Sequence, residues 1–208
     1  MISGANAHSE RLDVSRETME RLEILAALLE KWNKRINLVS KSTITNLWAR
    51  HILDSAQVVR TAPYNIPHWV DIGSGGGFPG LVIAILAAET GSPQRLTMIE
   101  ADQRKCAFLR TVLRETDVNA KVISQRIEEA PRQQAQVLSA RALADLTTLL
   151  SYSDRHLCDG GHAILLKGAT WKKEIAEARK SWSFTQEVIQ SITEPNAVVL
   201  KLGEIGRV

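Results

Sequence analysis

The chain has 208 residues and a net charge of +3, with 44% hydrophobic and 24% charged residues, and this ordinary composition excludes a disordered, collagen-like or fibrous protein. The longest apolar run, residues 81–88, is much shorter than the roughly 20 residues of a membrane span. Because the start of the chain also lacks the apolar stretch of a secretory signal, we expect a cytoplasmic protein without membrane contact.

The first third of the chain has the apolar spacing of helices. Apolar residues recur every three or four positions over residues 19–36 and again over about 43–59, which predicts helices with one buried face each. A proline-containing break follows. We therefore predict an N-terminal helical extension over residues 1–62 and a second unit over residues 63–208.

The remainder alternates short apolar segments with helical ones. The predicted strands are residues 69–72, 96–99, 121–124, 136–139, 162–166 and 197–202. The predicted helices are residues 80–90, 103–115, 143–157 and 171–180. This alternation predicts an α/β fold with a mostly parallel sheet, whose ligands bind beyond the carboxyl ends of the strands.

A glycine-rich segment follows the first of these strands. It reads Asp71-Ile-Gly73-Ser-Gly75-Gly-Gly77-Phe78-Pro79-Gly80. Five glycines in eight positions carry a large entropic cost for an ordinary connection, and Pro is favoured at the first position of the next helix. The segment therefore predicts a cofactor-binding loop.

The glycine spacing alone does not identify the cofactor, because Gly75-x-Gly77-x-x-Gly80 also satisfies the fingerprint of dinucleotide-binding proteins. The matching glycines start late after the strand, Pro79 removes one of the N–H groups that a pyrophosphate needs, and Asp71 stands on the strand itself. These features favour S-adenosylmethionine over NAD, with Asp71, Gly75 and Gly77 in its site. Glu100, at the end of the next strand, is suited to accept hydrogen bonds from two ribose hydroxyls.

Other chemistries have little support. The histidines show no metal-ligand spacing, so we predict no metal site. Cys106 and Cys158 are too few for a disulfide framework, and neither has the context of a cysteine nucleophile. No Asp/Asn-Pro-Pro-Tyr/Phe sequence is present, which disfavours methylation of an exocyclic amine.

Several short motifs together resemble the bacterial ribosomal RNA small subunit methyltransferase G family, also called glucose-inhibited division protein B. The motifs are Trp32-Asn-Lys-Arg-Ile-Asn-Leu38, Arg50-His-Ile-Leu-Asp-Ser55, the loop of residues 71–80, Glu100-x-x-x-Arg104-Lys105, Arg126-Ile-Glu-Glu129, Ser139-Ala-Arg-Ala142 and Leu165-Leu-Lys-Gly168. The resemblance covers about residues 32–168. It implies a class I S-adenosylmethionine-dependent methyltransferase fold, which is Rossmann-like, with an N-terminal helical extension.

The resemblance also implies a reaction, the methylation of N7 of one guanosine in 16S ribosomal RNA. By position, the cofactor contacts of the family correspond to Gly73, Phe78, Ile127, Glu128 and Arg141. The acid at the end of the second strand is Glu here where the family often has Asp. Guanine N7 carries a lone pair and loses no proton, so no general base is expected and no catalytic residue is assigned.

The partner that the resemblance implies is 16S ribosomal RNA, in the small subunit or its precursor. We expect the enzyme to be a monomer, because nothing in the sequence suggests an obligate partner. Residues 103–141 carry eight Lys or Arg against four Asp or Glu, a pattern that fits either a phosphate-binding surface or a solvated face. The candidates for RNA binding are Arg50, His51, Arg104, Lys105, Arg126, Lys167, Lys172 and Lys173. Asn33 is a further contributor, and Trp32 fits core packing better than base stacking. Two alternatives stay open, an NAD-dependent oxidoreductase and a non-catalytic RNA-binding assembly factor.

Overall fold

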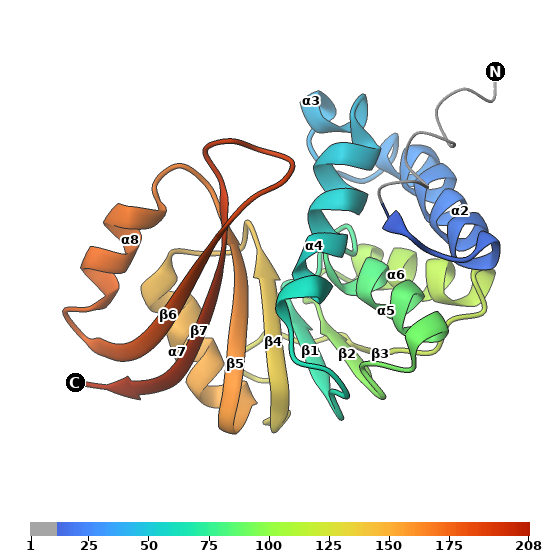
Figure 1. Cartoon of the computed structure of the whole chain (residues 1–208). Coiled ribbons are helices and arrows are strands. Elements are labelled where there is room, and N and C mark those ends of the chain that lie inside the picture. The colour runs from blue at the N-terminus through green and yellow to red at the C-terminus, as the bar shows by residue number, and fades with distance from the viewer. Residues whose placement is uncertain (1–11) are drawn as a thin grey trace.

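The computed structural model describes residues 12–208 (Figure 1). In chain order the structure contains α2 (Arg16–Asn33), α3 (Lys41–Ile44), the π-helix η1 (Trp48–Leu53), α4 (Asp54–Thr61), β1 (Trp69–Ile72), α5 (Gly80–Thr90), β2 (Leu96–Ile99), α6 (Gln103–Glu115), β3 (Lys121–Ile123), β4 (Ala135–Arg141), α7 (Leu146–His156), β5 (Leu157–Lys167), α8 (Trp171–Ala178), β6 (Trp182–Gln190) and β7 (Val198–Arg207). The first eleven residues of the predicted extension lie outside the described range. The predicted boundary between this extension and the second unit, at residues 62 and 63, stays a prediction.

Within residues 12–208, seven strands form one sheet in the order β3-β2-β1-β4-β5-β7-β6. Strands β1 to β5 run parallel to one another, whereas β7 is antiparallel to both β5 and β6. The order reverses between β1 and β4, and such a switch point opens a crevice at the carboxyl ends of the strands. The predicted α/β class with a mostly parallel sheet is confirmed.

Helices cover both faces of this sheet, as Figure 1 shows. Alternate residues of β1 point to opposite faces: Trp69 packs with α2, α4, α5 and α6, and Val70 packs with α7 and α8. Both side chains are fully buried. The glycine loop that follows β1 is therefore anchored by a strand with core on both sides.

The N-terminal helices belong to the same core as the sheet. Ser15 caps α2 by accepting a hydrogen bond from the Thr18 N–H, and the buried face of α2 joins the cluster that contains Trp69 and α5. Trp32 packs edge-on against Phe108, with ring centroids 5.7 Å apart. This contact agrees with the predicted core role of Trp32, and it fixes the end of α2 against α6.

Two predictions about secondary structure are wrong. Residues 43–59 do not form one helix, because α3 ends at Ile44 and the π-helix η1 precedes α4. The strand β6 was not predicted; of its side chains only those of Trp182 and Phe184 are buried, and the rest give a weak strand pattern at the edge of the sheet. The other elements lie where the sequence places them, apart from shifted ends. No helix among residues 12–208 is both long and apolar enough to cross a membrane.

Candidate functional site

A cleft of about 780 Å³ lies at the carboxyl ends of the parallel strands. It is lined by side chains and loops from most of the chain, namely residues from 38–57, 73–78, 99–105, 125–128, 141–152, 166–174 and 191–199. Figure 1 shows that α3 and the β6–β7 loop lie at the same end of the molecule, beside the tip of β4. The cleft is thus where the topology predicts a ligand site.

The glycine loop has the geometry of a cradle. Gly73, Gly75 and Gly77 have φ values of +60°, +54° and +87°, which L side chains rarely adopt. A Cβ at Gly73 would lie 2.5 Å from Leu143 Cδ1, and one at Gly77 would lie 2.2 Å from Leu81 Cδ1. Gly73 and Gly75 line the cleft, where their bare backbone fits the close approach of a nucleoside-like cofactor, whereas Gly77 packs against Leu81 and Leu109 and does not line it.

Glu100 holds the rim of this loop. Its Oε2 accepts a hydrogen bond of 2.8 Å from the Gly75 N–H, and its Oε1 accepts one of 2.8 Å from the Asp102 N–H. A carboxylate oxygen accepts more than one hydrogen bond, so each oxygen keeps capacity for a ribose hydroxyl. Glu100 lines the cleft, in the position that the sequence predicted for a ribose contact.

Asp71 lies behind the loop rather than in the cleft, which corrects the expectation that its carboxylate faces a ligand. It is 1% exposed, its Oδ1 accepts a hydrogen bond of 2.7 Å from Ser139 Oγ, and Trp69 Nε1 donates to the same Ser139 oxygen over 2.9 Å. Its Oδ2 has no hydrogen-bond partner and faces Gly80, where a Cβ would come within 2.7 Å. Burial raises the pKa of Asp71 to about 6. The carboxylate therefore links β1 to β4 through Ser139 and packs against the start of α5.

Ile127 and Glu128, the two cofactor contacts expected from the family resemblance, line the cleft together with Tyr152. Their contact with the cofactor stays a prediction. The Tyr152 hydroxyl donates to Glu128 Oε1 over 2.5 Å. This hydrogen bond, together with burial, raises the pKa of Tyr152 to about 12. Sequence reasoning missed Tyr152, because nothing in α7 distinguishes an aromatic residue at the cleft from one in the core.

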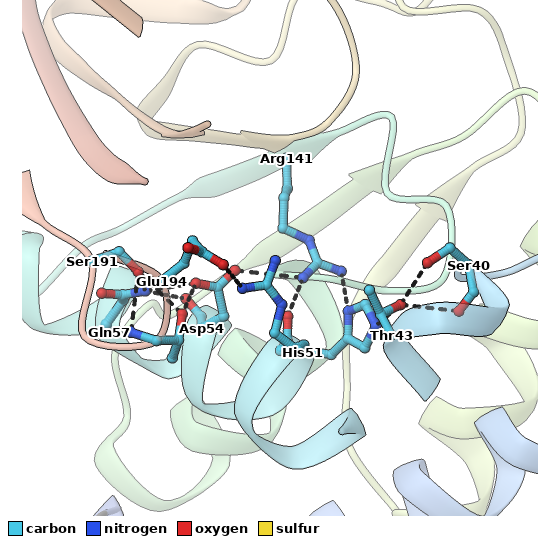
Figure 2. Close-up of polar contacts among 10 residues, drawn as sticks. Ser40, Thr43, His51, Asp54, Gln57, Arg141, Ser191 and Glu194 are labelled. Carbon is cyan, nitrogen blue, oxygen red and sulfur yellow. Dashed lines mark hydrogen bonds and ion pairs between the residues drawn. The ribbon is translucent and has the colours of Figure 1, made fainter. Parts of the chain in front are cut away.

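Arg141 at the end of β4 joins two distant parts of the chain (Figure 2). Its guanidinium donates to the Arg50 carbonyl oxygen over 3.0 Å and to His51 Nδ1 over 2.8 Å, and it lies 3.6 Å from Asp54 Oδ2. It also lies over the ring of Phe78, 5.0 Å from the centroid. Four residues that the sequence singled out, Arg50, His51, Phe78 and Arg141, thus meet at one point.

The proton on His51 can be assigned from its partners. Arginine only donates, so Nδ1 of His51 is the acceptor and Nε2 carries the proton, which it donates to Thr43 Oγ1 over 2.9 Å. Burial, followed by the charges of Arg141 and Arg50, lowers the pKa of His51 to about 3. The ring stacks on Phe78 with centroids 5.0 Å apart. His51 is therefore a neutral bridge between α3 and β4.

The β6–β7 loop closes the other side of this network. Asp54 Oδ1 accepts hydrogen bonds from Thr193 Oγ1 over 2.7 Å and from Gln57 Nε2 over 2.8 Å, and Arg50 pairs with Glu194 over 2.5 Å. Figure 2 shows these side chains in one continuous row. The N-terminal helices, β4 and the β6–β7 loop therefore share one polar network along the cleft.

The remaining candidates for RNA binding are spread over different surroundings. Lys105 and Arg126 line the cleft. Lys167 also lines it, but its ammonium is paired with Glu174 at 2.5 Å and donates to the Ala144 carbonyl oxygen. Arg104 is exposed and pairs with Asp102 over 2.9 Å. Lys172 and Lys173 belong to α8 and do not line the cleft. Within residues 12–208, no group of three or more His, Cys, Asp or Glu is placed to hold a metal ion.

Comparisons with known proteins find relatives that match nearly the whole chain. The family model described as rRNA small subunit methyltransferase G matches residues 18–200. A protein named ribosomal RNA small subunit methyltransferase G from Ruegeria sp. (strain TM1040) is 55% identical over 197 residues, which cover 95% of this chain and 96% of the relative. One of the same name from Ruegeria pomeroyi is 53% identical over 208 residues, 100% of both chains.

Solved structures resemble the fold at low sequence identity. A SAM-dependent methyltransferase from Aquifex aeolicus has a TM-score of 0.59 at 10% identity and covers 85% of this chain and 97% of its own. TYW2 from M. jannaschii in complex with AdoMet has a TM-score of 0.56 at 14% identity, with 84% and 80% covered. These likenesses confirm the predicted class I, Rossmann-like methyltransferase fold.

Proposed function

The chain belongs to the rRNA small subunit methyltransferase G family, and we propose that it transfers a methyl group to N7 of one guanosine in 16S ribosomal RNA. Family membership decides between the two cofactors that the glycine motif left open. The cofactor is S-adenosylmethionine, the reaction is methyl transfer to ribosomal RNA, and the NAD-dependent alternative is excluded. The atom that is methylated and the mechanism are the proposal.

The cofactor, when bound, supplies an electrophilic methyl group on a sulfonium centre. The groups that would hold it line the cleft: the backbone of the glycine loop and the side chains of Phe78, Glu100, Ile127, Glu128 and Arg141. The free capacity of Glu100 Oε1 and Oε2 suits a pair of ribose hydroxyls. Gly73 and Gly75 expose their backbone to the cleft, and a side chain at Gly73 would collide with Leu143.

One observation supports the proposed N7 specificity: the side chains beside the cleft that could act as a general base already take part in hydrogen bonds or ion pairs. Asp54 accepts from Thr193 and Gln57 and is paired with Arg141. His51 accepts from Arg141 and donates to Thr43. Glu174 is engaged as well, by Lys167, the Leu146 N–H and Thr170. A nucleophile that must lose a proton needs a free base, whereas guanine N7 does not.

Catalysis then rests on orientation. Holding N7 in line with the methyl group is worth roughly 7–11 kcal/mol of the barrier without any proton transfer. The ring gains positive charge during transfer, so a free cation against it would oppose the reaction. Arg141 is kept from that role, because its charge faces Asp54 and its donors are directed to His51 and the Arg50 carbonyl.

The test is a transfer assay with S-adenosylmethionine that carries a labelled methyl group. Transcribed 16S RNA and isolated small subunits are offered separately, and the labelled nucleoside is identified by mass spectrometry after digestion. We expect one 7-methylguanosine, absent with Gly73→Asp. Label at another guanine atom would overturn the N7 proposal, and RNA binding without transfer would support the non-catalytic assembly factor. The comparison of substrates also shows whether the enzyme acts on free RNA or on the particle.

A further inference from the structure

The charges that line the cleft mostly cancel. Arg50 pairs with Glu194, Arg141 with Asp54 and Lys167 with Glu174. Within the described part of the chain, five basic residues at or beside the rim have no ion pair: Lys34, Arg35 and Lys41 on one side and Lys105 and Arg126 on the other. Lys34 and Arg35 belong to the connection between α2 and α3, and Lys41 is the first residue of α3. The sequence analysis assigned none of these three to RNA.

The sequence around this connection is strongly one-sided in charge. Residues 31–53 contain five Lys or Arg and no Asp or Glu, so this segment carries more positive charge than the net +3 of the whole chain. Lys34, Arg35 and Lys41 are exposed. Such a segment attracts a polyanion, and it contains no carboxylate that would compete with phosphate groups for its basic side chains.

The connection is also held in one conformation. Asn33 Oδ1 accepts hydrogen bonds from the N–H groups of Leu38, over 2.9 Å, and Val39, over 3.0 Å. The Trp32 carbonyl oxygen accepts from the N–H groups of Arg35 and Ile36 at 2.9 and 3.0 Å. Asn33, a predicted RNA contributor, thus acts on the backbone. The basic side chains start from a fixed backbone, so binding costs little main-chain entropy.

The same connection packs directly on the glycine loop. A Cβ at Gly76 would lie 2.9 Å from the Leu38 carbonyl oxygen, so the two backbones are in close contact there. Leu38, Val39 and Ser40 line the cleft. Residues 34–41, here called the basic turn, therefore lie at the cleft edge, next to the cofactor loop.

We propose that the basic turn binds the phosphodiester backbone of the RNA strand whose nucleotide enters the cleft. This rests on the proposed function, because it needs an RNA substrate. Contacts to phosphates fix the register of a nucleic acid without reading its sequence. The turn therefore positions the strand, and selection of the base belongs to the cleft.

The test uses two double variants with the same change in charge. Lys34→Gln/Arg35→Gln alters the basic turn. Lys121→Gln/Arg132→Gln is the matched control. Both residues are exposed. Lys121 starts β3 and Arg132 shortly precedes β4, so both lie near the amino ends of the parallel strands, whereas the cleft lies at the carboxyl ends. Binding of the full-length proteins to transcribed 16S RNA and to isolated small subunits is measured over a series of salt concentrations.

We expect the turn variant to bind more weakly and to lower the salt dependence, the slope of log K against log[salt], by about 1.5, since each lost phosphate contact removes about 0.7–0.9. The control variant keeps the wild-type slope, and both keep the wild-type melting temperature and affinity for S-adenosylmethionine. An unchanged slope for the turn variant, or an equal loss in both variants, would overturn the proposal. A failure of the proposed function would give a different result: the wild-type protein would bind RNA but transfer no methyl group to guanine N7.

Discussion

Arg141 donates a hydrogen bond from Nη2 to Nδ1 of His51 over 2.8 Å, and the two residues are 90 positions apart in the chain. The imidazole has to be neutral to accept this bond, and its other nitrogen is used by Thr43. His51 therefore fixes the direction of the guanidinium at the end of β4. It also ties the N-terminal helices to the strand that borders the cleft.

The first prediction separates the two contacts of His51. His51→Phe keeps a ring against Phe78 and removes the acceptor, whereas His51→Asn keeps an acceptor oxygen near the position of Nδ1 and removes the ring. Because a hydrogen bond to a charged group contributes about 1.5–3 kcal/mol, we expect His51→Phe to raise KM for S-adenosylmethionine roughly tenfold or more. His51→Asn should recover most of this loss. Steady-state kinetics at pH 7 provide the measurement.

A melting curve of each variant is the control, since loss of packing alone would lower both the melting temperature and kcat. If His51→Phe had wild-type kinetics and His51→Asn did not, the stacking on Phe78 would be the contact that matters. The role of His51 in orienting Arg141 would then be excluded.

The second prediction concerns acid stability. Burial and two neighbouring arginines lower the pKa of His51 from 6.5 to about 3 in the folded protein. Between these values the unfolded chain binds a proton that the folded chain does not bind. The free energy of unfolding therefore falls as the pH is lowered from about 6.5 towards 3. The contribution is complete above about 6.5.

The size of this effect is measured by urea unfolding of the wild type and of His51→Asn at pH 7 and pH 5. After allowance for screening by solvent, we expect the wild type to lose about 1 kcal/mol more than the variant between these two values. Equal losses in both proteins would show that the His51 ring takes up its proton without disturbing the fold.

The glycine loop and its acid were predictable because the requirements are local. Positive φ values at Gly73, Gly75 and Gly77 need glycine, and an acid at the end of the neighbouring strand, Glu100, lies beside the loop in any sheet of this order. Periodicity likewise located α2 and α6, whereas α5 was located by its unbroken apolar run between two strands. These elements follow from neighbours in sequence or from a regular repeat.

The Arg141 network was not predictable from local pattern, since its members come from η1, α4, β4 and the β6–β7 loop. The role of Lys167 was hidden for the same reason, because Glu174, its partner at 2.5 Å, is identified only after β5 and α8 are placed. Asp71 shows the opposite problem. Its position in the motif suggests a ligand contact, but the alternation of β1 directs its side chain towards Ser139 and the start of α5.

The third prediction tests Glu100. Glu100→Gln keeps the size of the side chain, but its amide NH₂ replaces an acceptor that now faces the Gly75 or the Asp102 N–H. Loss of a charged acceptor costs about 1.5–3 kcal/mol, so we expect KM for S-adenosylmethionine to rise roughly 10- to 100-fold with a smaller change in kcat. Glu115→Gln, at the exposed end of α6, is the matched control. A fall in kcat with unchanged KM would contradict a role in cofactor binding.

The fourth prediction compares Gly75→Ala with Gly77→Ala. Both glycines have positive φ, so both variants pay the backbone cost of about 1–2 kcal/mol for an L side chain in that region. At Gly75 the nearest atom to a new Cβ is 3.6 Å away, whereas at Gly77 Leu81 Cδ1 is 2.2 Å away and Leu109 Cδ2 is 3.2 Å away. Overpacking of a core typically costs about 1–3 kcal/mol, so Gly77→Ala should unfold at a lower urea concentration than Gly75→Ala. Gly75 lines the cleft, so Gly75→Ala should lose affinity for S-adenosylmethionine while it keeps most of its stability. Equal urea midpoints for the two variants would contradict the prediction, because they would mean that Leu81 moves aside freely.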